Sequence, residues 1–407
     1  MEIYLVGGAV RDKLLGIEPK ERDWVVVGAT PEEMIAQGYQ QVGKDFPVFL
    51  HPETKDEYAL ARTERKTGPG YTGFQVHAAP DVTLEEDLIR RDLTINAMAE
   101  DSNGNVIDPF NGRDDLKNGL LKHVSPAFDE DPVRILRVAR FAARFARWGF
   151  KVSHSTNALM RTMVEAGEVD ALVPERVWAE MEKALNEQNP ERFFEVLRGC
   201  NALVKLFPEI DQLFGVPQPE KHHPEIDTGV HVMLVLQQAA KISADPKVRF
   251  AALTHDLGKG TTPKQEWPKH HGHEGRSVLL VSELCDRYRI PNEFRELAVL
   301  TAKYHTHCHN AEELKPSTML EVIEAMDAFR RPERFENYLL ACEADFRGRP
   351  GYEQLEYPQV DRFRMALKAA LSVNTKDIIE KGLKGEAIKQ ELHKQRVNAI
   401  RQALNTD

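Results

Sequence analysis

Several features are scarce or missing in this chain of 407 residues. It has only four cysteines, scattered and without a Cys-x-x-Cys pair, which predicts the reduced thiols of a cytosolic protein. No apolar run approaches the ~20 residues that a membrane-spanning helix needs, so we expect no membrane partner. The first residues are not a basic stretch followed by an apolar one, so we expect no signal peptide and a cytoplasmic location.

Positive charge is in the minority, with 54 Lys and Arg against 64 Asp and Glu and a formal net charge of −10. This balance argues against a protein that coats nucleic acid over its whole surface, but it allows a local basic groove. Low-complexity tracts and internal repeats are also missing. The chain is too long for one hydrophobic core, and its length predicts two to four domains.

The first strand-forming run of the sequence ends at a pair of glycines. Residues 3–6 are β-rich, Gly7 and Gly8 follow, and Arg11 lies in the short helix predicted next. Glycines at a strand end let the backbone approach a ligand closely, and their N–H groups can bind phosphate oxygens. Arg11 is placed to add a charge-assisted hydrogen bond to the same phosphates.

Two carboxylates, Glu21 and Asp23, open the second strand-forming run, which continues through residues 24–27. Side chains two residues apart on a strand point to the same face, so the two carboxylates are predicted to converge. Mg²⁺ prefers oxygen ligands together with substrate phosphates, and it would relieve their mutual repulsion. The alternative is a surface hairpin with solvated acids. Glu57, at the start of a later strand, is a third candidate carboxylate.

Two further segments of the first third are basic. Residues 63–73 are polar and glycine-rich, and we expect a mobile loop there, either a lid over the phosphates or a plain surface loop. Residues 84–99 have helical apolar spacing, interrupted by Arg90, Arg91 and Asp92. The paired arginines are either a solvated face or phosphate ligands.

A helix with a stripe of arginines is predicted from Val133 onward, with Asp131 as its N-cap and Pro132 at its first position. Five arginines recur at intervals of three or four without acidic neighbours at i±4 inside the predicted helix, which is unusual for a solvated helix: Arg134, Arg137, Arg140, Arg144 and Arg147. We therefore expect their anions to arrive as ligand phosphates or RNA backbone.

Asp131 and Arg134 are also candidates for base selection. Cytosine and adenine each present an exocyclic amino donor beside a ring-nitrogen acceptor, whereas guanine and uracil present the reverse pattern. A carboxylate and a guanidinium supply the matching acceptor and donors. A wrong base would leave buried groups unpaired, at about 1–3 kcal/mol each. The alternative is a plain capping role for Asp131.

Five elements of the sequence together resemble the class II tRNA nucleotidyltransferases, the CCA-adding enzymes: GGAVRD, the spaced carboxylates, RRDLTINA, IDPFNG and EDPVRILRVAR. The resemblance is to the long gamma-proteobacterial type, which carries a C-terminal HD phosphohydrolase domain, and it covers nearly the whole chain. GGxVRD alone is shared with bacterial poly(A) polymerases.

The resemblance implies specific roles for residues that match the family motifs. Gly8 and Arg11 would bind the incoming ATP or CTP, with Arg91, Arg137 and Arg140 contacting chiefly its phosphates. Glu21 and Asp23 would hold Mg²⁺, and Glu130, Asp131 and Arg134 would select C and then A without a nucleic-acid template. The family usually has aspartate where this chain has Glu21, which predicts slower catalysis or a shifted metal preference. The implied reaction is two-metal nucleotidyl transfer to the 3′-hydroxyl of tRNA.

Histidines are concentrated in the second half, where ten of the fifteen lie between His222 and His309. Imidazoles and carboxylates suit transition metals, and the ordered candidates are His231, His255, Asp256, His273 and His305. The segment THDLGK at 254–259 resembles the HD phosphohydrolase superfamily. That resemblance implies phosphatase, 2′-nucleotidase and 2′,3′-cyclic phosphodiesterase activity supported by a divalent transition metal such as Ni²⁺; the alternative is a degenerate fold.

Three further residues lie outside this ordered set. Asp345 is a candidate for a further metal carboxylate, although its segment could equally face RNA. His307 and His309 have no assigned role.

The resemblance implies an α+β fold, with a polymerase-β-like α/β head followed by all-α neck, HD and tail domains. We place the head at 1–115, the neck at 116–220, the HD domain at 225–330 and the tail at 331–407. The expected partners are tRNA, CTP and ATP, and the expected state is a monomer or a homodimer. A poly(A) polymerase, a metal phosphohydrolase with an RNA-binding N-terminal half and a non-enzymatic tRNA-binding protein are the alternatives.

Overall fold

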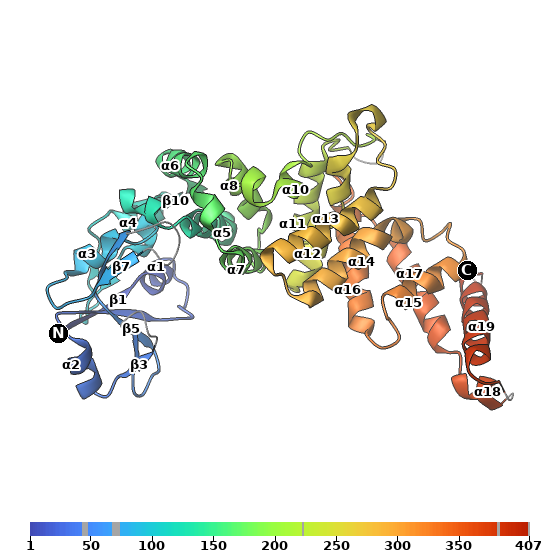
Figure 1. Ribbon diagram of the computed structural model, residues 1–407, viewed down its shortest axis with the longest axis horizontal. Coiled ribbons are helices and arrows are strands. Elements are labelled where there is room, and N and C mark those ends of the chain that lie inside the picture. The colour runs from blue at the N-terminus through green and yellow to red at the C-terminus, as the bar shows by residue number, and fades with distance from the viewer. Residues whose placement is uncertain (43–47, 67–73, 222–223, 381–382, 406–407) are drawn as a thin grey trace. The chain divides into compact units, whose positions relative to one another are not determined.

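The computed structural model describes residues 1–42, 48–66, 74–221, 224–380 and 383–405 (Figure 1). The chain forms two compact units, one of residues 1–181 and 192–205 and the other of residues 182–191 and 206–407. All the strands of the described residues lie in the first unit, and the second is helical, which confirms the predicted α+β class. The division into head, neck, HD domain and tail stays a prediction.

Two findings in the described residues concern the cysteines and the apolar helices. The four cysteines are all buried and free of disulfides. Every helix that the structure describes is too short or too polar to cross a membrane.

A seven-stranded mixed sheet forms the centre of the first unit. The β2 and β5 strands are parallel, and the other neighbours are antiparallel. In spatial order the strands are β3 (Gln40–Val42), β4 (Val48–Leu50), β5 (Glu57–Leu60), β2 (Asp23–Val27), β1 (Glu2–Val6), β8 (Ala99–Glu100) and β9 (Val106–Ile107).

Both faces of this sheet are packed. Successive residues of a strand point to opposite faces, and Val25 and Val26 of β2 accordingly belong to two separate clusters of buried residues. Val25 packs with Val6 and Leu88, whereas Val26 packs with Phe49 and Leu60. The apolar runs at residues 3–6 and 24–27 are thus used as the sequence predicts.

The remaining elements of the first unit are mostly helices. They are α1 (Gly8–Leu14), α2 (Pro31–Ala36), α3 (Leu84–Ile89), α4 (Gly112–Lys117), α5 (Val133–Phe145), α6 (His154–Glu165), α7 (Pro174–Leu185), α8 (Glu191–Gly199) and α9 (Leu203–Leu206), with the strand pairs β6 (Thr63–Lys66) and β7 (Phe74–His77), and β10 (Leu120–Leu121) and β11 (Lys151–Val152). Helices α7 and α8 extend across the division between the units.

Four local predictions need correction. Glu21 precedes β2, which begins at Asp23, so the two carboxylates do not share a strand. Residues 63–66 form strand β6 rather than a loop, and 67–73 lie outside the described residues. The helix predicted over 84–99 ends at Ile89. Helix α5 begins at Val133 after Pro132, and the Asp131 carboxylate accepts the Val133 N–H at 3.1 Å without being the N-cap residue.

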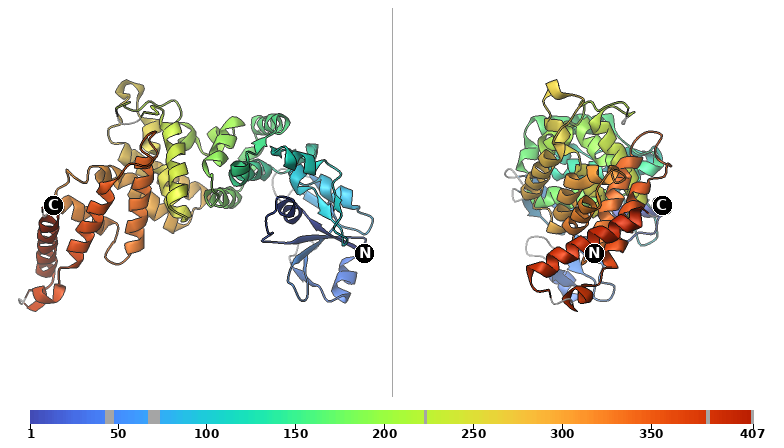
Figure 2. Two further views of the ribbon diagram at one scale, coloured as in Figure 1. Left: turned by 180° about the vertical axis from the view of Figure 1, so that it is seen from behind. Right: turned by 90° about the vertical axis from the view of Figure 1, so that its right-hand side faces the viewer.

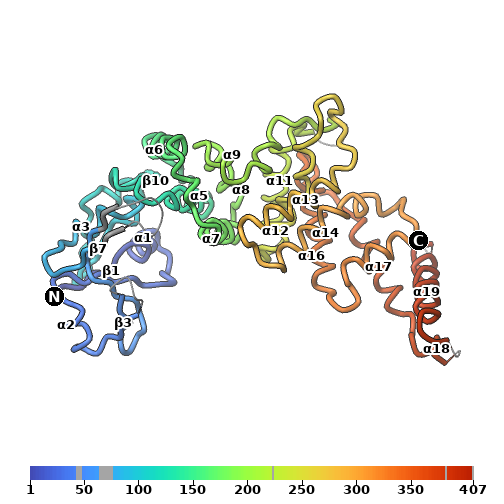
Figure 3. Tube along the Cα trace, in the orientation of Figure 1, coloured from blue at the N-terminus to red at the C-terminus, as the bar shows by residue number. Residues whose placement is uncertain are grey.

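The second unit is a set of helices whose trace is followed in Figures 2 and 3. They are α10 (Pro208–Asp211), α11 (Thr228–Ile242), α12 (Pro246–Thr254), α13 (His273–Tyr288), α14 (Asn292–His309), α15 (Pro316–Ala325), α16 (Pro332–Arg347), α17 (Pro358–Leu371), α18 (Thr375–Glu380) and α19 (Glu386–Leu404). Helix α11 packs on α12 and α16, and α14 packs on α12, α13 and α16.

Small side chains allow close packing at the centre of this unit. Ala239 of α11, Ala252 of α12 and Ala344 of α16 form a buried cluster with Val235. Helices that meet through alanines approach closely, so polar side chains carried one turn away on each of them come within reach of one another.

Candidate active site and metal centre

The glycine turn after β1 lies against two of the predicted arginines. Gly7 has φ +68°, and a Cβ built there would lie 2.9 Å from Nη1 of Arg91. A Cβ on Gly8 would lie 3.3 Å from Nη2 of Arg11. The structure therefore brings Gly8, Arg11 and Arg91 together, as predicted, and only glycine suits the backbone at position 7.

Arg11 is buried and held by protein partners. Its guanidinium donates to Oδ1 of Asp12 at 2.7 and 2.9 Å and to Oδ1 of Asn96, and it lies over the Phe141 and Phe145 rings. Burial lowers the pKa of Arg11, and Asp12 offsets part of that effect. Arg11 is therefore a fixed part of the protein interior that lies against the glycine turn.

The carboxylates lie at a neighbouring position of the sheet. Asp23 is in register with Val6 on one side and Glu57 on the other, and it lines a pocket of about 490 Å³ together with Glu21 and Glu57. Burial raises the pKa of Asp23 and Glu21 raises it further, while Arg91 lowers it. A divalent cation would stabilise the charged form of Asp23, and the three carboxylates of the pocket are oxygen donors that fit Mg²⁺.

Three arginines of the stripe on α5 are paired with acids of the protein, which corrects the expectation that their anions come from ligands. Arg137 donates to Asp92 at 2.7 Å, Arg140 to Glu180 at 2.6 Å, and Arg144 to Asp12 at 2.9 Å. These acids come from α1, α7 and the segment after α3, so a comparison of positions along α5 alone misses them.

Asp92 holds Arg137 directly and Arg11 through Asn96, and sequence reasoning did not assign it a role. Its carboxylate accepts hydrogen bonds from Arg137, from the Asn96 amide at 3.0 Å and from the Leu93 N–H at 2.8 Å. Burial alone would raise the pKa of Asp92, but Arg137 and Asn96 hold it well below its usual range. Its place inside the RRDLTINA motif was the available signal.

The residues predicted to select the base lie where the 3₁₀-helix Pro126–Glu130 meets α5. Arg176 of α7 forms a two-pronged ion pair with Asp131, at 2.8 and 3.2 Å. Arg134 is buried and donates to the carbonyls of Ala127 at 2.6 Å and Arg90 at 2.7 Å. Glu130 ends the 3₁₀-helix, one residue before Asp131. The three residues thus lie close together in the chain, and neighbours that the sequence did not reveal orient Asp131 and Arg134.

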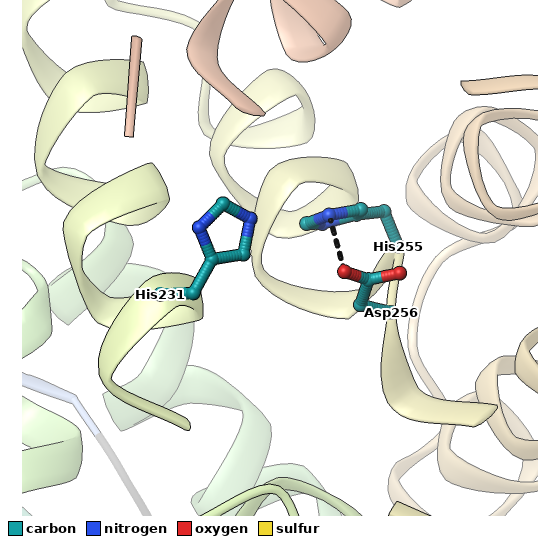
Figure 4. A group of neighbouring side chains, drawn as sticks. All are labelled: His231, His255 and Asp256. Carbon is teal, nitrogen blue, oxygen red and sulfur yellow. Dashed lines mark ion pairs between the residues drawn. The ribbon is translucent and has the colours of Figure 1, made fainter. Parts of the chain in front are cut away.

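In the second unit, four buried residues form a cluster: one from α11, one from α16, and two from the end of α12. Nε2 of His231 (α11) lies 2.9 Å from Oδ1 of Asp345 (α16), and Nε2 of His255 lies 3.1 Å from Oδ2 of Asp256 and 3.4 Å from Oδ2 of Asp345. Figure 4 shows His231 pointing toward His255 and Asp256. The structure thus brings together the predicted His231, His255 and Asp256 and places Asp345 among them.

A second group shares Asp256 with the first. Oδ1 of Asp256 lies 3.3 Å from Nε2 of His273 and 3.5 Å from Nε2 of His305, and the two Nε2 atoms are 3.3 Å apart. Metal–nitrogen bonds of ~2.0–2.1 Å place neighbouring ligand atoms about 3 to 3.5 Å apart. All five predicted residues of this centre are therefore within range of a metal.

The hydrogen bonds of the imidazoles fix their tautomers. Nδ1 of His255 faces the Ala252 carbonyl at 2.7 Å, Nδ1 of His273 faces the His270 carbonyl at 2.9 Å, and Nδ1 of His305 faces carbonyls of α14 at 3.1 and 3.2 Å. Because a carbonyl only accepts, each Nδ1 carries a proton, so Nε2 is the nitrogen of each ring that a metal would bind.

The electrostatics of this cluster also suit a cation. Burial lowers the pKa of His255, but Asp256 and Asp345 outweigh it and raise the pKa to about 10. Burial lowers the pKa of His305 to about 4, so this ring is neutral. Nε2 of His255 and Oδ1 of Asp256 are buried without a hydrogen-bond partner. These atoms fit a divalent metal, which would bind them directly.

Three family models match the chain in order. The "Poly A polymerase head domain" matches residues 3–122, the "Probable RNA and SrmB- binding site of polymerase A" matches 149–214, and the "HD domain" matches 228–332. The glycine turn and the carboxylates lie in the first match, and His231, His255, Asp256, His273 and His305 in the third.

Two curated relatives cover the full length. The Multifunctional CCA protein of Thioalkalivibrio sulfidiphilus is 67% identical over 402 residues, which is 99% of this chain and 98% of the relative. That of Nitrosococcus oceani is 63% identical over all of both chains. The chain belongs to the multifunctional CCA protein family. Members of this family are enzymes that combine a nucleotidyltransferase head with an HD domain, and the recognition made from the motifs is confirmed.

Solved structures share the fold of this multifunctional CCA protein family member. The Thermotoga maritima CCA-adding enzyme complexed with tRNA is 22% identical, with a TM-score of 0.65, and covers 100% of this chain and 91% of its own. The Bacillus stearothermophilus CCA-adding enzyme in complex with CTP is 24% identical, with a TM-score of 0.66, and covers 98% and 89%.

Proposed function

We propose that the head transfers nucleotides from CTP and ATP to the 3′-hydroxyl of tRNA, adding and repairing the terminal CCA and releasing pyrophosphate. The observation that carries this proposal is the convergence of the Gly7–Gly8 turn, Arg91 and Asp23 beside the pocket that Glu21 lines. The names of the curated relatives and the tRNA and CTP complexes of the distant structural neighbours support the substrates.

Each residue of the head has a defined task in this proposal. Glu21 and Asp23 hold Mg²⁺, which when bound would lower the pKa of the attacking hydroxyl and neutralise the leaving pyrophosphate. The backbone N–H groups at Gly8 cradle the triphosphate, and Arg91 contributes positive charge beside it. Arg137 and Arg140 reach the phosphates from positions held by Asp92 and Glu180. Glu57 is an auxiliary carboxylate of the pocket.

Selection of C and then A is assigned to Asp131 and Arg134, with Glu130 beside them. The Asp131 carboxylate accepts from the exocyclic amino group of the base, and Arg134 donates to the ring nitrogen. Both side chains already have protein partners that limit their movement, which preorganises them for two related bases. Uracil and guanine carry a carbonyl oxygen in place of the amino group, so the Asp131 carboxylate would face another acceptor.

For the HD domain we propose a divalent-metal phosphohydrolase that acts as a phosphatase, 2′-nucleotidase and 2′,3′-cyclic phosphodiesterase, with Ni²⁺ as a suitable metal. The supporting observation is the buried set of imidazole Nε2 and carboxylate oxygen atoms around Asp256. His231, His255, Asp256 and Asp345 would hold the metal. His273 and His305 lie beside Oδ1 of Asp256, whereas His255 lies beside Oδ2. The bound metal would polarise the phosphate and activate water, and Lys259, 2.6 Å from Asp256, balances the charge.

We further propose a cytoplasmic enzyme, monomeric or homodimeric, whose four domains are the head (1–115), neck (116–220), HD domain (225–330) and tail (331–407). The decisive experiment for the head is incorporation of labelled CTP and ATP into tRNA that lacks its 3′ end, with Mg²⁺ present. We expect two C and one A in the wild type and none in Asp23→Ala. A long A tail made without CTP would instead identify a poly(A) polymerase.

Glu21→Asp is the matched variant for the metal position, because it keeps the charge and shortens the side chain by one methylene. If the longer side chain slows catalysis, Glu21→Asp will accelerate incorporation or broaden the choice of metal. Unchanged rates with Mg²⁺ and Mn²⁺ would show that glutamate serves as well as aspartate.

A further inference from the structure

A histidine and a tyrosine outside the two metal-ligand groups contact the Asp345 carboxylate in series. Nε2 of His309 lies 2.7 Å from Oδ2 of Asp345, and Nδ1 of His309 lies 2.7 Å from the hydroxyl of Tyr357. Because a carboxylate only accepts, Nε2 of His309 donates to Asp345. His309 ends α14, Asp345 lies on α16, and Tyr357 immediately precedes α17.

His309 differs from the histidines of the metal groups in the use of its ring nitrogens. His255, His273 and His305 direct Nδ1 at backbone carbonyls and keep Nε2 for the cluster. His309 has one nitrogen against the carboxylate and the other against Tyr357, so neither is directed at a metal. It contacts the centre by its hydrogen bond to Asp345, and its ring also lies edge-to-face with that of His305, with centroids 6.1 Å apart.

We propose that His309 and Tyr357 are positioning residues that orient Asp345 for the divalent metal of the HD centre, an inference that rests on the phosphohydrolase function proposed above. A carboxylate on a short side chain rotates about its last bond. A hydrogen bond to Oδ2 restricts that rotation, which keeps Oδ1 beside Nε2 of His231 at 2.9 Å and Oδ2 within 3.4 Å of Nε2 of His255.

Tyr357 is itself held firmly, which a positioning role requires. Its ring stacks on Phe346 with centroids 4.5 Å apart and an interplanar angle of 19°. The residue is 6% exposed, so water cannot readily replace its hydroxyl beside His309. Hydrogen-bond partners of metal ligands typically contribute about 10–100-fold in metal affinity.

The test is the Ni²⁺ affinity of the full-length chain, measured by calorimetry with the head saturated by Mg²⁺. We expect binding about 10–100-fold weaker in Tyr357→Phe and His309→Leu. His309→Gln, which keeps an amide donor in reach of Asp345, should bind more tightly than His309→Leu. The visible absorption of bound Co²⁺ gives a second readout, and its bands should change in Tyr357→Phe because the carboxylate is no longer held in one orientation.

Two matched variants separate positioning from general loss of packing. Tyr288→Phe removes a buried hydroxyl that donates to the Leu206 carbonyl away from the centre, and His307→Gln changes another histidine of α14. Both should keep wild-type affinity for Ni²⁺. Wild-type affinity and an unchanged Co²⁺ spectrum in Tyr357→Phe and His309→Leu would overturn the proposal, as would an equal loss in Tyr288→Phe. If the unmodified chain binds neither metal, the proposed function of the centre fails first, and this role fails with it.

Discussion

Replacing Asp92 with asparagine tests whether one buried carboxylate organises the arginines of the head. Asp92 is 6% exposed and accepts from Arg137, Asn96 and the Leu93 N–H. A hydrogen bond to a charged group contributes about 1.5–3 kcal/mol. The Arg137 side chain is 37% exposed, so water offsets part of its loss. We therefore expect Asp92→Asn to lower the free energy of unfolding of the first unit by about 2 kcal/mol at pH 7.

The pH dependence has a definite sign. The pKa of Asp92 lies well below its usual range in the folded chain, and an unfolded aspartate titrates near ~3.9. The stabilisation is therefore complete above about pH 5 and is lost as the pH falls toward the folded pKa. The gap between wild type and Asp92→Asn should narrow steadily below about pH 4.

Urea unfolding followed by tryptophan fluorescence measures this gap. Trp24, Trp148 and Trp178 lie in the first unit and Trp267 in the second. In a Trp267→Phe background the signal reports on the first unit alone. Asp114→Asn, an exposed carboxylate of α4, is the control and should change stability by less than about 0.5 kcal/mol. The role of Asp92 would be refuted if the wild type and Asp92→Asn differed by less than about 0.5 kcal/mol in free energy of unfolding at pH 7. It would also be refuted if their difference stayed constant down to about pH 3.

Three further predictions concern the glycine turn, base selection and the metal centre. Gly7→Ala should destabilise the first unit by about 1–3 kcal/mol, because φ is +68° and the new Cβ would lie 2.9 Å from Nη1 of Arg91. The same urea assay measures this loss of stability. The control is Gly16→Ala, because Gly16 has a similar φ of +70° but space for a Cβ, so the difference between the two variants is the steric part. Arg176→Gln should reduce the preference for CTP over UTP by about 5- to 150-fold in kcat/KM, because Asp131 loses its two-pronged partner. An unchanged preference would mean that this ion pair serves stability alone. Ni²⁺ at 100 times its Kd should stabilise the second unit of the wild type by about 2.7 kcal/mol, and it should not stabilise that of Asp256→Asn. The shift in melting temperature on adding Ni²⁺ measures this effect. Equal shifts in the two proteins would mean that the metal binds elsewhere.

The local parts of both sites were predictable from sequence, and their supporting partners were not. The Gly7–Gly8 turn was evident because a β-rich run, two glycines and a helical pattern follow one another directly. The partners of the α5 arginines were hidden, since Asp12 precedes Arg144 by 132 positions and Asp92 precedes Arg137 by 45. The end of α3 at Ile89 and the position of Glu21 before β2 were also missed, because tertiary packing overrides helical spacing and strand extension there.

At the metal centre, too, the sequence predicted some of the clustered residues and left another open. The residue types, their order and the resemblance of residues 254–259 to the HD superfamily predicted His231, His255, Asp256, His273 and His305. Asp345 lies 114 positions from His231, and nothing in its immediate neighbours distinguishes a metal ligand from an exposed acid. Only the packing of α16 against α11 and α12 brings its carboxylate to the cluster.

The distribution of this centre along the chain constrains how the protein can be recombined. The "HD domain" match ends at residue 332, yet Asp345, which contacts His231, and Tyr357, which contacts His309, lie beyond it. A chimera with its crossover at that boundary would combine the histidines of one parent with the carboxylate and tyrosine of the other. Crossovers after Leu371, the end of α17, leave the centre in one parental piece and are the better choice for exchanging the C-terminal helices between homologues.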